Sequence, residues 1–241
     1  KTSDKMSNPY FQFKQFTVWH DKCAMKVGTD GVLLGAWTSV QGAHSILDVG
    51  TGTGLVALML AQRSLPNTNI VALEIDEAAA EQAKENIVRS PWKKQIEVVQ
   101  TDFRKYQSPE KFDVIVSNPP YFVDSLGCPD QQRNSARHND SLTYEELLEG
   151  VTGLLTENGT FTIVIPMDVA DRVKMIASEK KLQAVRQLNV ITKPGGIPKR
   201  TLITFSFANQ ECIVEELLTE VARHQYSKEY IALTREYYLN M

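Results

Sequence analysis

The stretch Ser45-Ile-Leu-Asp-Val-Gly-Thr-Gly-Thr-Gly54 decides the fold class of this chain. Residues 45–49 form a short apolar run typical of a buried strand, and a glycine-rich turn follows. Residues 55–63 then show the apolar spacing of a helix. Such a turn lets the backbone approach a ligand, and the start of a helix offers free N–H donors. The sequence therefore predicts an α/β fold with a nucleotide-like ligand at this turn.

Short apolar runs and helical segments continue to alternate along the chain, which is typical of a parallel sheet covered on both faces. A Gly/Pro turn at 193–198 joins the last two expected strands, which favours an antiparallel hairpin at one edge. We therefore expect a seven-stranded, mostly parallel sheet with an antiparallel edge hairpin. The expected strands are 45–49, 69–73, 95–99, 112–117, 160–165, 183–192 and 201–207, and the expected helices are 55–63, 77–88, 142–155, 169–180 and 227–239.

The chain reads as a single domain, 1–241, without a linker or repeat that would divide it. Residues 1–44 are expected to be an N-terminal extension that packs over the ligand site, and 45–241 the core. The helix at 142–155 is expected to be capped by Asp140 or Ser141 and to end at the turn Glu157-Asn-Gly159. The stretch 211–222 fits either a helix or a strand.

Composition and charge exclude several classes of protein. The 241 residues carry a formal charge of −3 and are 42% hydrophobic, which is ordinary for a globular domain. The slight excess of negative charge argues against a protein that coats nucleic acid by bulk charge. The longest apolar run, Leu55–Ala61, is far shorter than the ~20 residues of a membrane span, and no secretory signal opens the sequence. Three cysteines without CxxC spacing predict no metal site. We expect a cytoplasmic protein with no membrane or metal partner.

The glycine-rich turn does not fit the usual phosphate-binding patterns. Its Gly-x-Gly-x-Gly spacing differs from the dinucleotide fingerprint, and no Lys-Ser/Thr pair follows as in a phosphate loop. Glu74 ends the second strand, where a carboxylate can accept both hydrogen bonds of a ribose diol. Asp102 and Phe103 follow the third strand and suit an amino group and an apolar ring face. A single carboxylate at a strand end is more often a helix cap than a ligand-binding residue. Here three successive strand ends carry a glycine-rich turn or a carboxylate, which favours one ligand site.

The order and spacing of these features resemble the class I methyltransferases that use S-adenosylmethionine (SAM). The resemblance implies their Rossmann-like fold and a SAM site at the strand ends. The expected cofactor residues in the core are Asp48, Gly50, Gly52, Gly54, Glu74, Ile75, Asp102, Phe103 and Asn118.

The fourth strand ends in Asn118-Pro119-Pro120-Tyr121. The string resembles the Asn/Asp-Pro-Pro-Tyr/Phe motif of methyltransferases that act on planar amino groups, such as N6 of adenine, N4 of cytosine or the glutamine amide. The Asn118 side-chain oxygen and the Pro119 carbonyl can each accept one N–H, which aims the nitrogen lone pair at the methyl group. Prolines fix φ and remove competing donors, and Tyr121 offers a stacking face. The simpler alternative is that Pro-Pro only ends the strand.

Several longer stretches resemble the bacterial tRNA1(Val) adenine-37 N6-methyltransferases. They are Phe13–Phe16, Asp21–Trp37, the Asn-Pro-Pro-Tyr motif, Pro129–Ala136 and Tyr226–Thr234, spread over nearly the whole chain. The resemblance implies methylation of N6 of the adenine beside the valine anticodon. It also implies that Lys26, Gly28, Thr29 and Asp30 close over the methionine end of SAM. A plain helix start before 31–37 is the alternative for residues 28–30.

Under this interpretation a tRNA is the partner, and basic residues in loops contact its phosphates. The candidates are Lys14, Arg133, Arg137, Lys193, Lys199 and Arg200. Two other functions stay open: a glutamine-amide methyltransferase that acts on a translation factor, and a SAM-binding RNA module without turnover. About 47 residues precede Asp48, which leaves little room for the helical domain of the glutamine branch. Nothing in the sequence implies an oligomer.

Overall fold

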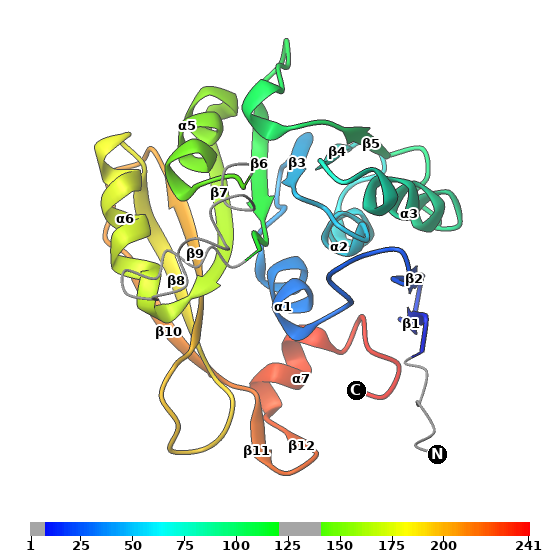
Figure 1. The fold of residues 1–241 in the computed structure, drawn as a ribbon. Coiled ribbons are helices and arrows are strands. Elements are labelled where there is room, and N and C mark those ends of the chain that lie inside the picture. The colour runs from blue at the N-terminus through cyan, green and yellow to red at the C-terminus, as the bar shows by residue number, and fades with distance from the viewer. Residues whose placement is uncertain (1–7, 121–140) are drawn as a thin grey trace, which may run out of the picture.

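A central sheet organises the computed structural model, which describes residues 8–120 and 141–241 (Figure 1). Within those ranges the sheet has eight strands in the order β10-β8-β9-β7-β6-β3-β4-β5. All neighbours pair in parallel except β9, which is antiparallel to both β7 and β8. The strands are β3 (Ser45–Val49), β4 (Asn69–Glu74), β5 (Ile96–Gln100), β6 (Phe112–Ser117), β7 (Leu155–Pro166), β8 (Gln183–Ile191), β9 (Arg200–Ser206) and β10 (Ile213–Leu218).

Helices and two apolar cores cover both faces of the sheet. Successive side chains of a strand point to opposite faces of the sheet. In β3, Ile46 accordingly belongs to one buried cluster and Leu47 to the other. The first cluster holds α1 (Thr29–Trp37), α2 (Leu55–Arg63) and residues of α3 (Glu77–Val88) and α7 (Lys228–Thr234). The second holds residues of α5 (Tyr144–Leu154) and α6 (Ala170–Glu179). Apolar side chains on both sides of each central strand confirm the expected α/β class.

The strand β10 resolves the stretch that the sequence left open. It pairs in parallel with β8, so the β8–β9 hairpin is not the outermost part of the sheet. Ile213 and Val214 are 62% and 56% exposed, and among the residues of β10 only Leu217 is buried. The strand is therefore held by backbone pairing more than by burial, which explains its weak apolar pattern.

Two sequence-based expectations around α5 were wrong. The N-cap is Thr143, whose hydroxyl accepts from the Glu146 backbone N–H at 3.1 Å, and not Asp140 or Ser141. Glu146 Oε1 accepts back from Thr143, which completes a capping box. The expected turn at 157–159 is an irregularity within β7, because the backbone goes straight from helix into strand at Leu155. The last helix, α7, also ends at Thr234, earlier than expected.

The N-terminal segment lies against α3 and leads toward the carboxyl ends of the strands. It forms a small hairpin of β1 (Tyr10–Gln12) and β2 (Thr17–Trp19). Asn86 on α3 exchanges hydrogen bonds of 2.9 Å with both the backbone N–H and the carbonyl of Trp19. A second hairpin, β11 (Glu220–Ala222) and β12 (Gln225–Tyr226), precedes α7. The division into an extension and a core stays a prediction.

Close packing of α1 on α2 gives a first testable prediction. A Cβ at Gly35 would lie 2.6 Å from Sδ and 2.8 Å from Cβ of Met59. We expect Gly35→Ala to destabilise the protein by about 1–2 kcal/mol, because overpacking outweighs the gain in helix propensity. Gly153→Ala in α5 is the matched control, since its Cβ would meet nothing within 4 Å. Urea denaturation should show Gly153→Ala to be neutral or stabilising, and equal effects of the two variants would contradict the packing argument.

Candidate active site

A cavity of about 580 Å³ opens at the carboxyl ends of the central strands. Polar residues that follow β3, β4, β5 and β6 meet there, because parallel strands bring their carboxyl ends to one edge. Residues 23–31 of the N-terminal segment line another side of the cavity, and Ser141 and Leu142 line it from the chain before α5. The expected site residues on its walls are Lys26, Gly28, Thr29, Asp30, Asp48, Gly50, Gly52, Glu74, Ile75, Asp102, Phe103, Asn118, Pro119 and Pro120.

The glycine-rich turn is left-handed at three positions. Gly50, Gly52 and Gly54 have φ of +74°, +56° and +87°, which L side chains rarely adopt. A Cβ at Gly50 or Gly52 would meet nothing within 4 Å, so both positions face open space. Gly54 differs, because it does not line the cavity and begins α2 as its N-cap, against Ala83. Gly50 and Gly52 therefore lie on the cavity wall, and Gly54 lies at the start of α2.

Glu74 fixes this turn and the end of β4. Its Oε1 accepts from the Gly52 backbone N–H at 2.8 Å, and its Oε2 accepts from the Asp76 N–H at 3.0 Å. Each carboxylate oxygen keeps a second lone pair for a ligand. The neighbouring Ile75 lines the cavity and is 56% exposed, so its apolar surface is available to a ring.

Asp48 is a buried carboxyl group on the cavity wall. Its Oδ2 accepts from Thr51 Oγ1 at 2.7 Å. Burial raises the pKa of Asp48 from its ordinary value of 3.8 to about 7, and the negative charge of Glu74 acts in the same direction. The group therefore changes its charge near neutral pH.

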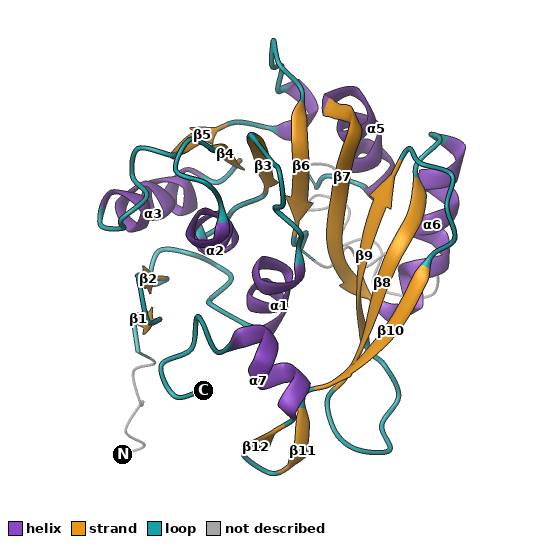
Figure 2. Cartoon of the chain, turned by 180° about the vertical axis from the view of Figure 1, so that it is seen from behind, coloured by secondary structure: helices purple, strands orange, loops and turns teal. Residues whose placement is uncertain are grey.

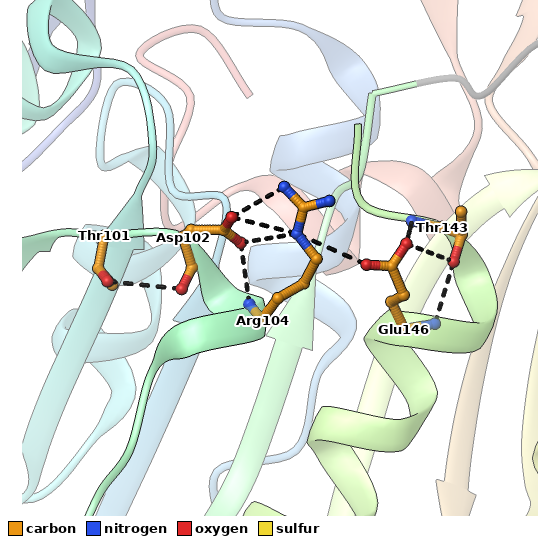
Figure 3. A network of polar contacts seen from close by, with 5 residues as sticks. All are labelled: Thr101, Asp102, Arg104, Thr143 and Glu146. Atoms are coloured by element: carbon orange, nitrogen blue, oxygen red, sulfur yellow. Dashed lines mark hydrogen bonds and ion pairs between the residues drawn. The ribbon is translucent and has the colours of Figure 1, made fainter. Parts of the chain in front are cut away.

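Asp102 is part of a network that the sequence did not reveal (Figure 3). The Arg104 side chain reaches back and donates to both oxygens of Asp102, from Nε at 3.0 and 3.1 Å and from Nη2 at 2.8 Å. Arg104 also lies 3.5 Å from Glu146 Oε2 at the start of α5. Its hydrogen bonds and charge lower the pKa of Asp102. The carboxylate expected to take an amino group is thus fixed in place by a cation.

Phe103 has a smaller share in the cavity than expected. It is 7% exposed, and its ring packs so closely on α5 that a Cβ at Gly150 would lie 2.4 Å from its Cε1. Phe103 still lines the cavity, but most of its side chain is packed in the buried cluster that contains α5.

Asn118, Pro119 and Pro120 form the wall that follows β6. Ser117 Oγ donates to the Val49 carbonyl at 2.9 Å, which joins the ends of β6 and β3 immediately before the motif. Pro119 is buried and Asn118 is half-buried. Tyr121 lies outside the described residues, as do Arg133, Arg137 and the stretch Pro129–Ala136.

The segment 26–30 both starts a helix and lines the cavity. Gly28 is the N-cap of α1, as the simpler interpretation expected, and Lys26, Gly28, Thr29 and Asp30 all contribute to the wall. Asp30 Oδ2 also accepts from Arg200 Nε at 3.2 Å. Gly31 brings α1 next to the motif, since a Cβ there would lie 3.6 Å from Asn118 Nδ2.

Lys193, Lys199 and Arg200 lie in or beside the β8–β9 loop, at the same end of the sheet as the cavity (Figure 2). Lys14 is placed differently, because its ammonium group donates to the Arg235 carbonyl and its side chain lines neither this cavity nor a second one beside it.

The described residues hold no cluster of three or more His, Cys, Asp or Glu that could bind a metal. They also hold no helix long and apolar enough to cross a membrane.

Known proteins and a family model align with most of the chain. The family model "Methyltransferase small domain" covers residues 27–192. A tRNA1(Val) (adenine(37)-N6)-methyltransferase of Bacteroides thetaiotaomicron is 80% identical over 98% of this chain and 100% of its own length. Proteins with the same name from Phocaeicola vulgatus and Tolumonas auensis are 53% and 44% identical over 98% of this chain and 100% and 99% of their own lengths.

Solved structures share the fold at low sequence identity. A predicted O-methyltransferase from Agrobacterium tumefaciens aligns with a TM-score of 0.68 at 17% identity, over 88% of this chain and 100% of its own. A glycopeptide N-methyltransferase, solved in complex with SAM, aligns with a TM-score of 0.55 at 13% identity, over 76% of this chain and 90% of its own.

Proposed function

The chain belongs to the family of the tRNA1(Val) (adenine(37)-N6)-methyltransferases, and on that basis we propose that it methylates N6 of adenine 37 in the anticodon loop of tRNA1(Val) with SAM as methyl donor. The observation that carries the proposal is the position of Asn118, Pro119 and Pro120 on the wall of a cavity built from the glycine-rich turn. Full-length identity of 80% to a protein with that name supports the choice of substrate.

The charge of the cavity fits SAM better than a phosphate-bearing nucleotide. The described wall residues include five carboxylates, Asp30, Asp48, Glu74, Asp76 and Asp102, and two cationic side chains, Lys26 and Arg104. Arg104 is paired with Asp102, and Asp30 is paired with Arg200. Glu74, Asp76 and the ionised fraction of Asp48 then outweigh Lys26, so the excess charge is negative. A negative cavity attracts a sulfonium cation and repels a pyrophosphate. The open space at Gly50 and Gly52 leaves room for a ligand against the backbone.

SAM supplies a methyl group that is activated by its bond to a positively charged sulfur. The protein has to hold the target nitrogen in line with that group. We propose that the Asn118 side-chain oxygen and the Pro119 carbonyl accept the two N–H bonds of the adenine amino group. Both acceptors also stabilise the positive charge that develops on the nitrogen, so they act by orientation and electrostatics. An unpaired loop adenine is a suitable target, because it leaves its stack at less cost than a paired base.

Mass spectrometry of nucleosides from treated tRNA tests the proposal directly. Unmodified tRNA1(Val) is incubated with the protein and SAM, digested, and searched for N6-methyladenosine, which fragment mapping should place at position 37. Transfer of labelled methyl to a protein acceptor instead of tRNA would support the glutamine-amide alternative. SAM binding without transfer to any RNA would support the binding-module alternative. Either result would overturn the proposed function.

The basic β8–β9 loop gives a prediction about tRNA binding. Arg200 is engaged with Asp30, so Lys193 and Lys199, both exposed, are the cleaner positions to change. We expect Lys193→Glu with Lys199→Glu to weaken tRNA binding and to reduce the slope of log K against log salt by roughly 1–2, since each lost phosphate contact removes about 0.7–0.9. SAM affinity should stay unchanged.

The matched control changes two exposed lysines at the opposite end of the strands. Lys94 precedes β5 and Lys111 precedes β6, so Lys94→Glu with Lys111→Glu makes the same change in net charge away from the cavity. Titrations at several salt concentrations should show a normal slope for this control. Equal losses in both double variants would mean that the β8–β9 loop has no specific role.

A further inference from the structure

A second cavity, of about 770 Å³, lies beside the active site. Its walls come from the N-terminal hairpin, the start of α1, the ends of the β8–β9 loop, the β11–β12 hairpin and the chain around α7. Figures 1 and 2 both show these segments together at the end of the sheet where the parallel strands terminate. The volume lies within the roughly 300–1,000 Å³ that is usual for small-ligand sites. The methyl-transfer chemistry proposed above makes no use of this cavity.

The two cavities share a wall. Thr29 and Asp30, in the first turn of α1, line both of them. The ion pair between Asp30 and Arg200 lies on this wall, because Arg200 lines the second cavity. The first turn of α1 therefore lies between the two cavities, which makes them neighbours.

An exposed aromatic ring is the main recognition feature of the second cavity. Tyr226 is 43% exposed, and its ring centroid lies 5.3 Å from that of Tyr230. Tyr230 is only 3% exposed, and its hydroxyl group lies 3.4 Å from that of Tyr238. Burial raises the pKa of both Tyr230 and Tyr238, so their hydroxyls stay uncharged. Tyr226 is thus an exposed ring that packs against the buried ring of Tyr230, with the partly buried Tyr238 behind it.

The backbone around Tyr226 is firmly held. The next residue, Ser227, is the N-cap of α7, and its hydroxyl accepts from the Tyr230 backbone N–H at 3.0 Å. The Ser227 backbone N–H donates to the Thr219 carbonyl at 2.9 Å. A ring on such a fixed junction loses little entropy when a ligand stacks on it.

The charges around the opening favour a polyanion. Lys199 lines the cavity and is exposed. Two further exposed cations do not line it but lie on segments that do, Lys193 in the β8–β9 loop and Arg223 between β11 and β12. The acidic wall residues are Asp30, which is paired with Arg200, and Glu220. Exposed cations around an aromatic platform are typical of surfaces that bind single-stranded nucleic acid.

We propose that the second cavity binds the base of a nucleotide directly next to adenine 37, stacked on Tyr226, while adenine 37 occupies the active site. The inference rests on the proposed function, because it takes the anticodon loop as the ligand. Sequence-specific proteins usually recognise unpaired RNA in this way, with splayed bases stacked on aromatic side chains. The shared wall at Thr29 and Asp30 fits two consecutive bases that enter adjacent cavities.

A double-mutant cycle between protein and RNA tests this pairing. The protein variants are Tyr226→Ala and Tyr226→Phe, and the RNAs are an anticodon stem-loop and two versions with an abasic site 5′ or 3′ of adenine 37. We expect Tyr226→Ala to raise KM for the intact stem-loop by about ten- to a hundredfold, the usual effect of losing one base stack. Tyr226→Phe should behave like wild type. One of the two abasic RNAs should bind wild type poorly and lose nothing further with Tyr226→Ala.

Val221→Ala is the control, because Val221 lies on the same hairpin and is 48% exposed but does not line the cavity. Thermal unfolding and SAM affinity of all variants should match wild type. Additive losses with both abasic RNAs, or an unchanged KM for Tyr226→Ala, would overturn the inference and leave the proposed function intact. A wild-type protein that does not methylate the intact stem-loop or full tRNA would overturn both.

Discussion

Replacing Asn118 by alanine is expected to lower the turnover number by about 10²–10³-fold, the usual effect of removing one preorganised group that stabilises charge in the transition state. The substitution removes an acceptor oxygen from the wall that faces the cofactor cavity. The backbone should stay in place, because Ser117 Oγ still donates to the Val49 carbonyl and Pro119 remains buried. Single-turnover methylation of tRNA measures the loss, and calorimetry should find SAM affinity nearly unchanged.

Asn118→Asp is the matched control. It keeps an acceptor oxygen of the same reach and is the other residue found at this place in the Asn/Asp-Pro-Pro-Tyr/Phe motif. We therefore expect it to retain more turnover than Asn118→Ala. Near-normal turnover of the alanine variant would contradict the role given to Asn118. A loss of SAM binding equal to the loss of turnover would instead assign Asn118 to cofactor binding alone.

The sequence was sufficient to predict which strand ends form the cavity. A glycine-rich turn, Glu74, Asp102 and Asn118 each follow an apolar run, and parallel strands bring such residues to one edge whatever the details of packing. Local patterns of this kind depend on the chain near each residue. For the same reason the expected α/β class is confirmed by the order of the strands.

Features that depend on distant parts of the chain could not be predicted. Arg104 lies near Glu146, which is more than forty residues further on, and this partner does not follow from a local pattern. The strand β10 is defined by its pairing with β8 and not by an apolar face. Lys14 has a basic side chain in a loop, as predicted, but its contact with the Arg235 carbonyl is a tertiary one.

The β11–β12 hairpin illustrates the same limit at the second cavity. Tyr226 belongs to a stretch that carries the family resemblance, but the sequence around it did not predict a role for its side chain. The role proposed above depends on Tyr230 behind it and on the β8–β9 loop across from it, which fold from separate segments. An exposed tyrosine on a two-residue strand has no sequence signal of its own.

Asp48 is expected to make the protein less stable as the pH rises from about 4 to about 7. Burial raises its pKa in the folded state to about 7, whereas the unfolded chain has the ordinary value of 3.8. Well below pH 3.8 both states hold the proton, and the contribution of Asp48 to the stability of the folded state is complete. As the pH rises the unfolded state releases the proton first, so stability falls until the folded carboxyl also ionises. A difference of about 3 pH units corresponds to at most about 4 kcal/mol.

Asp48→Asn should abolish this dependence, because the amide carries no charge at any of these pH values. The variant should therefore be more stable than wild type at pH 8, by several degrees in Tm at roughly 2–4 °C per kcal/mol, and the difference should shrink toward pH 4. Urea denaturation of both proteins between pH 4 and pH 8 measures the effect. A constant difference across this range would show that Asp48 does not titrate as its burial implies.

The gain in stability should be accompanied by weaker cofactor binding. The ionised carboxylate of Asp48 adds negative charge to a cavity proposed to hold a sulfonium cation, so SAM should bind wild type more tightly as the pH rises through 7. In Asp48→Asn the affinity should be lower at pH 8 and should lose this dependence on pH. A buried acid that destabilises the fold is then retained because it serves the ligand, a trade-off common at functional sites. Parallel pH profiles of SAM affinity in the two proteins would rule out this explanation.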